Sequence, residues 1–298
     1  MANKNKNKTD QLFEFAQDSY FERTSRPVYA IFFLLPFIIF YELGTILINT
    51  DVLNQSQVRV VAFVWLRIFL EYLGFGSKLS WVAPPLAVII ILVSIQLVSR
   101  KQWRFLFFDI GPMAIECVLL AVPLIVLTLF LNSGVRGEGE INRFDSTVTS
   151  IQAEAAPVCS AVAGERPAGG AKVNGGKLMA DIVTGIGAGI YEELIFRLIL
   201  ISVLMIFFQD ILRMGQKRSI VFSVIISAAM FSAHHHIIFL NGQFAPTAPF
   251  NWTEFSFRTI AGIYFAALYA IRGFGITAGT HAFYDIIAVL INIRFFQQ

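Results

Sequence analysis

Residues 178–208 read LMADIVTGIGAGIYEELIFRLILISVLMIFF, an apolar run with Glu192, Glu193 and Arg197 near its centre. About 20 apolar residues are enough for a helix to cross a bilayer. An ionisable side chain in the middle of such a helix costs roughly 2.5 to 3.5 kcal/mol on insertion scales, so these residues mark a paired or functional site. The stretch therefore predicts a membrane protein with a polar pocket inside the bilayer.

The whole chain has the composition of a polytopic membrane protein. Of its 298 residues 56% are hydrophobic and 14% charged, and its mean hydropathy is +0.67, whereas soluble domains have about 25% charged residues. Residues 58–74 are apolar but carry Arg59, Arg67 and Glu71, which favours an interfacial or re-entrant helix, with an eighth span as the alternative. We expect an all-α transmembrane bundle of about seven to eight spans. The seven windows are 28–48, 79–99, 113–131, 178–208, 219–240, 254–271 and 274–295.

Basic residues flank these windows in short clusters. When the seven spans are drawn from a cytoplasmic Lys-rich tail, clusters at 100–104 and 213–218 and Arg272 fall on the same side, as the positive-inside rule requires. The N-terminus is therefore expected in the cytoplasm, and the protein in the inner or plasma membrane if its source is prokaryotic. A net charge of +3 in this arrangement indicates topology rather than a nucleic-acid partner. Cys117 and Cys159 match no zinc or redox spacing, and we expect no disulfide.

Helix geometry separates the two adjacent glutamates. Glu193 and Arg197 are four residues apart, so they share a face and can form an ion pair. Glu192 points about 100° away and stays available as a general base, especially beside a histidine. The alternative is a buried cluster of the two glutamates and the arginine that only stabilises the packing of the helices. One arginine, however, cannot neutralise two carboxylates.

The chain has four histidines, and all lie in apolar windows: His234, His235, His236 and His281. Phe231 and His235 are four residues apart and share a helix face, whereas the neighbours of His235 project about 100° to either side. At most two of these three histidines can address one pocket. His281 and Asp285 are also four apart, so the carboxylate can orient the imidazole.

Two GxxxG steps precede the polar residues. Gly185 and Gly189 lie just before the glutamates, and Gly275 and Gly279 just before His281. Small residues at this spacing let membrane helices approach closely. The polar residues are therefore expected to converge where the helices are closest.

The candidate chemistry is attack by water. Neither His-Glu-x-x-His nor an intramembrane Gly-x-Ser-x-Gly occurs, which excludes the common zincin and serine-nucleophile arrangements. Glu192, His235 and His281 could hold Zn²⁺ with the second glutamate as base, or Glu192 and a histidine could activate water without a metal while other groups stabilise an oxyanion. His234 is the alternate to His235. A proton- or ion-coupled transporter is the main alternative function, and a catalytically silent scaffold or immunity factor is another.

Three ordered motifs resemble those of a known family. These are Glu192-Glu193-x-x-x-Arg197, Phe231-x-x-x-His235 and His281-x-x-x-Asp285. They are similar to the motifs of the CPBP (CAAX-protease and bacteriocin-processing, also Abi) intramembrane proteases, which include the Rce1-type CAAX endopeptidases. The resemblance covers about residues 175–297.

The resemblance implies a role for each motif. Glu192 would activate water, His235 would assist or bind metal, and His281 with the residue four later would stabilise the transition state. Glu193 and Arg197 would hold the first helix in place. Asp285 departs from the asparagine of the prenyl-protease members, and an ionised aspartate cannot donate to an oxyanion. It is therefore expected to orient His281, to support a metal, or to be held protonated.

The sequence thus predicts a membrane-embedded, CAAX-protease-like metalloprotease that hydrolyses a peptide bond of a membrane-associated protein or peptide. The expected organisation has four parts: a cytoplasmic tail 1–27, membrane helices 28–131, a non-cytoplasmic loop 132–177 and a catalytic core 178–298.

Overall fold

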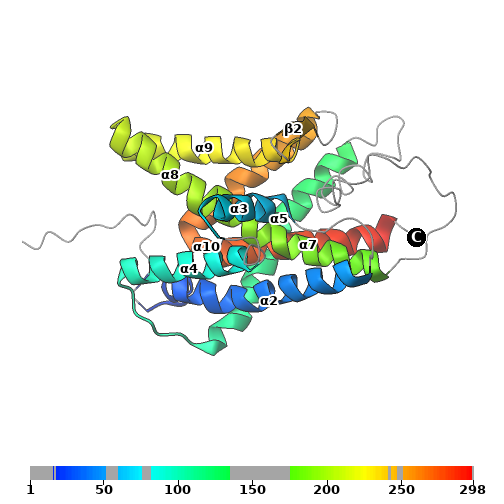
Figure 1. Ribbon diagram of the computed structural model, residues 1–298, viewed down its shortest axis with the longest axis horizontal. Helices are drawn as coiled ribbons and strands as arrows, with labels where there is room; N and C mark the ends of the chain where they lie inside the picture. Colours follow the sequence, from blue (N-terminus) through cyan, green and yellow to red (C-terminus); the bar gives the residue numbers. More distant parts are fainter. Residues whose placement is uncertain are drawn as a thin grey trace, which may run out of the picture.

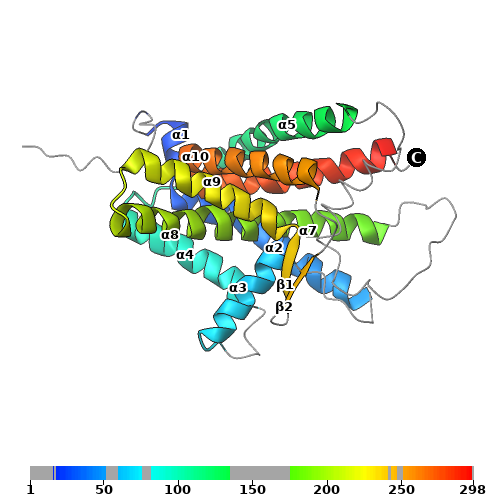
Figure 2. The same cartoon turned by 90° about the horizontal axis from the view of Figure 1, so that it is seen from above.

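The computed structural model describes residues 16, 18–51, 60–75, 82–134, 175–240, 243–246 and 251–296. Helices make up nearly all of these residues and pack side by side in one bundle (Figures 1 and 2). The expected all-α membrane bundle is confirmed. Most of the predicted loop 132–177 lies outside the described residues. Cys159 and Arg59 lie outside them as well.

The described residues up to Ser99 form four helices. They are α1 (Tyr20–Thr24), α2 (Pro27–Asp51), α3 (Val61–Tyr72) and α4 (Ala83–Ser99). Proline occupies the first turn of α2 and of α4, where its missing N–H costs no hydrogen bond. Helix α3 has 12 residues and so extends about 18 Å, less than the hydrocarbon thickness of about 30 Å. An interfacial or re-entrant position therefore suits α3, and α3 alone does not form an eighth span.

A short 3-10 turn, η1 (Phe107–Asp109), leads into α5 (Ile110–Gly134). After it, α7 (Gly175–Glu193) continues through a π-helical segment, η3 (Leu194–Leu200), into α8 (Ile201–Ile206) and a second π segment, η4 (Phe207–Ile211). Figure 1 shows this stretch changing direction between α7 and α8. Helix α9 (Gln216–His234) then returns beside α8.

The window 219–240 was wrong at its C-terminal end. Helix α9 stops at His234, and the chain passes through a turn at 235–236 into β1 (Ile237–Leu240). That strand pairs with β2 (Gln243–Pro246) in an antiparallel hairpin. Residues Ile237–Leu240 are as apolar as the membrane helix before them, so hydropathy did not reveal that the helix ends and a strand begins. The β-branched residues and the nearby loop were the available signals.

Helix α10 (Trp252–Phe296) consists of two helices joined at Gly273, whose φ of 76° and ψ of −179° suit glycine alone. The Phe265 ring stacks on the His281 ring with centroids 4.6 Å apart, whereas a continuous helix would separate these residues by about 24 Å. The two halves therefore run back along each other. This reversal agrees with the two predicted windows 254–271 and 274–295.

Within the part of the chain that the structure describes, four helical stretches are long and apolar enough to cross a membrane: Pro27–Ile48, Phe107–Phe130, Leu178–Ile211 and Trp252–Ile293. Ala83–Ser99 is a shorter apolar helix, and the last long stretch folds back at Gly273. The protein is an integral membrane protein. Each of the seven predicted windows coincides with a helical segment, apart from the end of the 219–240 window.

Glycines set the closest helix contacts. A Cβ at Gly189 would lie 2.6 Å from the backbone nitrogen of Ala282, and one at Gly185 would lie 2.7 Å from the Cβ of Asp285. Helix α7 therefore touches the second half of α10 where the polar residues begin. The other GxxxG step faces elsewhere, because Gly275 packs on Ala30 of α2.

Candidate active site

A cavity of about 80 Å³ lies between α7, α9 and both halves of α10. The start of α3 closes one side with Val60 and Val61. Much of the wall is apolar, and the polar residues in it include Glu192, His235 and His281. Residues of all three sequence motifs thus line one cavity.

Glu193 ties two of the motifs together. Its Oε2 lies 3.0 Å from Arg197 Nε, and its Oε1 accepts a 2.8 Å hydrogen bond from His281 Nδ1. The side chains of Glu193 and Arg197 are 0% and 1% exposed. Glu193 thus pairs with Arg197 and, through its other oxygen, also holds the His281 ring. Both oxygens of Glu193 are therefore engaged, and of the two adjacent glutamates it is Glu192 that lines the cavity.

Glu192 lies between histidines from two other helices. Its Oε1 is 3.7 Å from His234 Nε2, and its Oε2 is 3.9 Å from His281 Nε2. Both distances exceed a direct hydrogen bond. A carboxylate held this close to two imidazole nitrogens can share a bridging water or a cation with them.

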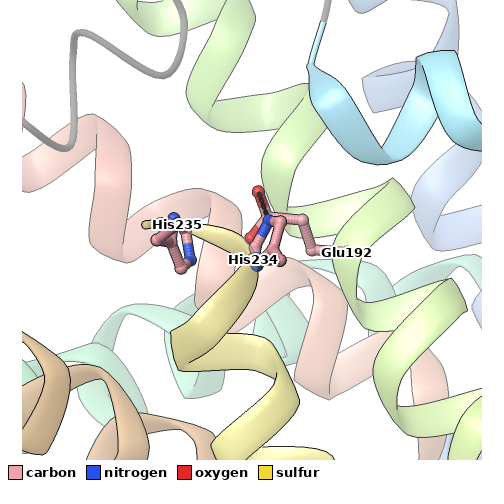
Figure 3. A group of neighbouring side chains, drawn as sticks. All are labelled: Glu192, His234 and His235. Atoms are coloured by element: carbon pink, nitrogen blue, oxygen red, sulfur yellow. Dashed lines mark ion pairs between the residues drawn. The ribbon is translucent and has the colours of Figure 1, made fainter. Parts of the chain in front are cut away.

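His234, and not the expected His235, is the histidine of α9 that lies beside Glu192. Its Nδ1 donates to the carbonyl of Phe231 over 2.6 Å, so its Nε2 is the atom turned toward Glu192. Figure 3 shows Glu192 and His234 pointing toward each other, with His235 just beyond the end of α9. His235 lines the cavity beside Phe231, as their shared face predicted. His236 instead packs near the Phe255 ring.

Three of these residues could hold a metal ion. One ligand atom each from Glu192, His234 and His235 lies within 4.8 Å of the others. This is somewhat wider than ligands around Zn²⁺ at about 2.0–2.1 Å would require, so a small inward movement would complete the set. The Phe231 carbonyl behind His234 is the outer partner that metal-binding histidines commonly have. The set contains His234 where the sequence suggested His281.

Asp285 is not the group that holds His281. Its Oδ2 lies 3.6 Å from His281 Nε2, beyond hydrogen-bond distance, and Glu193 occupies the other ring nitrogen. Asp285 lines the cavity and is 6% exposed. Glu193 thus makes the short hydrogen bond to the imidazole, while Asp285 lies near its other nitrogen.

Aromatic rings surround the polar groups. The Arg197 guanidinium lies 4.1 Å from the Phe231 ring centroid, and Phe265 stacks on His281. Cation–π contacts of this kind stabilise a buried guanidinium. The rings therefore keep Arg197 and His281 in fixed orientations in a low-dielectric setting.

Sequence reasoning missed three ionisable residues of the cavity wall: Asp181, Arg258 and Tyr284. It also missed Trp65 of α3, whose ring makes an edge contact with His234 at 5.6 Å. Arg258 and Asp181 carried a signal, since each is a charge in an apolar window. Nothing in the spacing of Trp65 or Tyr284 distinguishes them from lipid-facing aromatic residues.

Comparison with known families agrees with this site. Residues 175–287, more than a third of the chain, match the family described as Type II CAAX prenyl endopeptidase Rce1-like. This C-terminal part of the chain is similar to the Rce1-like family. The matched segment runs from the start of α7 to just past Asp285 and so contains the Rce1-like motifs on α7, α9 and α10. No curated protein and no solved structure gave a significant match.

Proposed function

We propose that this Rce1-like protein is an intramembrane endopeptidase that hydrolyses a peptide bond of a membrane-associated protein or peptide. The observation that carries the proposal is Glu192, a buried carboxylate that lines the cavity and lies between two histidines. Because Arg197 and His281 engage Glu193, the adjacent glutamate does not compete for this role. The family match supplies the protease chemistry.

In the proposed reaction Glu192 removes a proton from a water molecule, and the water oxygen attacks the carbonyl carbon of the scissile peptide. A protonated His281, held through Nδ1 by Glu193, donates from Nε2 to the developing oxyanion. Glu192 then returns the proton to the leaving nitrogen as the C–N bond breaks. The products are a new carboxylate and a new amine, and Glu192 is regenerated.

A zinc ion is a proposed cofactor of the same site. Glu192, His234 and His235 would hold it, and a bound Zn²⁺ lowers the pKa of a coordinated water and polarises a carbonyl. In that arrangement Glu192 serves as a ligand instead of as the base, and the chain's own contribution is to fix His234 through the Phe231 carbonyl. Asp285 would then act as a carboxylate beside His281.

The proposed organisation follows the sequence. Residues 178–298 form the catalytic core, 28–131 are accompanying membrane helices, and a tail 1–27 and a loop 132–177 lie on the cytoplasmic and opposite sides, respectively. A prenylated CAAX tail is one substrate precedent, since CAAX refers to a C-terminal tetrapeptide whose cysteine is lipid-modified.

Comparison of membrane proteomes tests the proposal. Membranes from cells that carry the wild type or Glu192→Gln are analysed by mass spectrometry for new protein termini, with Glu71→Gln on the exposed part of α3 as a matched control. Termini found with the wild type and the control but lost with Glu192→Gln support the proposal. Identical termini in all three samples, with ion or solute flux that depends on Glu192, would favour a transporter instead.

A further inference from the structure

Ser227 of α9 joins two helical stretches through its hydroxyl group. Hydroxyls in helices commonly donate to the carbonyl four residues earlier in the same helix, and three residues of this bundle do so: Thr184, Ser202 and Ser219. The Ser227 hydroxyl instead donates over 2.6 Å to the carbonyl of Phe196, 31 residues away in sequence. Ser227 is buried and is not a cavity-lining residue, so this bond is a contact between helices.

The acceptor lies in the π-helical segment η3, directly before Arg197. In a π-helix each hydrogen bond spans five residues instead of four, and such segments are rare and frequent at functional sites. They also change the direction of a helix, and Figure 1 shows the stretch turning between α7 and α8. The hydroxyl of Ser227 therefore holds the π-helical segment at one level of α9.

The candidate catalytic residues lie in the same direction from this bond on both helices. His234 follows Ser227 by seven residues, which is two turns or about 10 Å along α9. Glu192 precedes Phe196 by four residues, which is about 6 Å along the other stretch. Because α9 returns beside α8, the two stretches run in opposite directions. Both steps therefore end where Glu192 Oε1 lies 3.7 Å from His234 Nε2.

Phe196 also contacts His234 through its side chain. The centroid of its ring lies 4.9 Å from that of the His234 ring and 5.5 Å from that of the Phe231 ring. The Phe231 carbonyl in turn accepts the hydrogen bond from His234 Nδ1. The residue whose carbonyl Ser227 holds is thus packed against the imidazole that faces Glu192.

A second serine fixes α9 on its other side. The Ser232 hydroxyl donates over 2.7 Å to the carbonyl of Phe255, in the first half of α10. Two hydrogen bonds therefore connect the last part of α9 to its neighbours. Of the two, the bond of Ser227 reaches the stretch that carries Glu192.

We propose that Ser227 is a positioning residue, which sets the separation of Glu192 and His234 by holding α9 at one level of the π-helical segment. Its effect on the reaction rate rests on the proposed endopeptidase function, whereas its effect on His234 does not. Without the hydroxyl, the buried Phe196 carbonyl loses this donor, and an unsatisfied buried carbonyl is unfavourable. The helices should then shift, and the Glu192–His234 pair should shift with them.

NMR of the histidine rings measures this shift without relying on cleavage. The chain has four histidines, so full-length protein labelled with ¹³C,¹⁵N-histidine gives few ring signals, and single histidine substitutions assign them. Ser227→Ala should move the signals of His234, because they depend on the position of the neighbouring Phe196 ring. The signals of His236, which packs near Phe255, should stay in place. Ser227→Thr keeps the hydroxyl and should restore the wild-type spectrum.

Ser223→Ala is the matched control. Ser223 precedes Ser227 by one turn on the same face of α9 and is equally buried, but its hydroxyl has no hydrogen-bond partner among the described residues. This variant should keep the wild-type spectrum and rate. Ser227→Ala should lower kcat about 10- to 100-fold, since a displacement of about 1 Å can cost on the order of 100-fold. Its KM should change little, because Ser227 does not line the cavity.

The outcomes separate the two proposals. Unchanged His234 signals in Ser227→Ala, or equal shifts in Ser223→Ala and Ser227→Ala, would overturn the positioning role whether or not the protein cleaves peptides. Shifted His234 signals in a protein whose wild type cleaves no peptide would support the positioning role and count against the endopeptidase. If Ser227→Ala fails to fold, Ser227→Cys decides. Its thiol is a weaker donor, so the His234 signals should move by a smaller amount, and unchanged signals would again overturn the role.

Discussion

Among single residues, Glu193 determines the geometry of the site. One of its carboxylate oxygens holds Arg197, four residues on, and the other holds His281 of α10. The pair is fully enclosed, and an enclosed charge that loses its partner is strongly unfavourable. We therefore propose that Glu193 positions its neighbours and that Glu192 carries the chemistry.

Loss of Arg197 should destabilise the protein. Arg197→Ala leaves Glu193 without its cation inside the bundle, and breaking a buried pair costs about 3 to 5 kcal/mol. Thermal unfolding in detergent should show an early transition, while Arg213→Ala, an exposed arginine between η4 and α9, should melt like the wild type. A stable but inactive Arg197→Ala protein would move the arginine from support into the chemistry.

Substitution of the histidines tests whether the site binds zinc. If Glu192, His234 and His235 hold zinc, His234→Ala and His235→Ala should each lose bound metal, because removal of one of three ligands weakens affinity steeply. His236→Ala is the matched control, since His236 packs near Phe255 and is not a cavity-lining residue. Elemental analysis of the purified proteins measures the loss. Active wild-type protein without metal would refute zinc as the cofactor.

At this scale the sequence predicted the residues better than their partners. The Glu193–Arg197 pair follows from a spacing of four within one helix, so it could be predicted. The contact of Glu193 with His281 joins residues 88 apart in sequence, and no local pattern encodes it. The sequence pointed to His235 as the histidine beside Glu192, whereas the structure places His234 there, and the local pattern did not predict this either. Helix α9 ends at His234, and this end was hidden by the apolar residues that follow.

Among elements, the contact between α7 and the second half of α10 brings the motifs together. Gly189 lies against the backbone at Ala278 and Ala282, where any side chain would collide. The break at Gly273 returns α10 beside itself and brings Phe265 to His281. The site thus depends on two glycines that carry no chemistry.

Gly189→Ala adds only one methyl group but should reduce the peptide-cleavage rate strongly. The added Cβ would lie 2.6 Å from the Ala282 nitrogen, so α7 and α10 must separate, and a displacement of about 1 Å at a reacting group can cost on the order of 100-fold in rate. Gly111→Ala in α5 is the control, because its Cβ would meet nothing within 4 Å. Peptide-cleavage rates of the two variants provide the comparison. Equal rates would show that close packing of these helices is not required.

For the whole molecule, hydropathy was sufficient to place the helices but not to pack them. The seven apolar windows correspond to helical segments because the bilayer demands internally hydrogen-bonded spans of known length. Their arrangement depends on contacts between distant segments, such as α2 with α7 and α5 with α10. The two π-helical segments and the hairpin after α9 also left no periodic signal in the sequence.

The most direct test of the central claim compares the cleavage rates of purified wild type and Glu192→Gln on membrane-anchored peptides in ¹⁸O-labelled water. Glutamine preserves the shape of the side chain but cannot accept a proton from water, so the rate should fall about 100-fold or more, as is typical when a positioned base is removed. The wild-type product should carry one ¹⁸O atom in its new carboxylate. Cleavage by Glu192→Gln at a near-normal rate would contradict the role of Glu192.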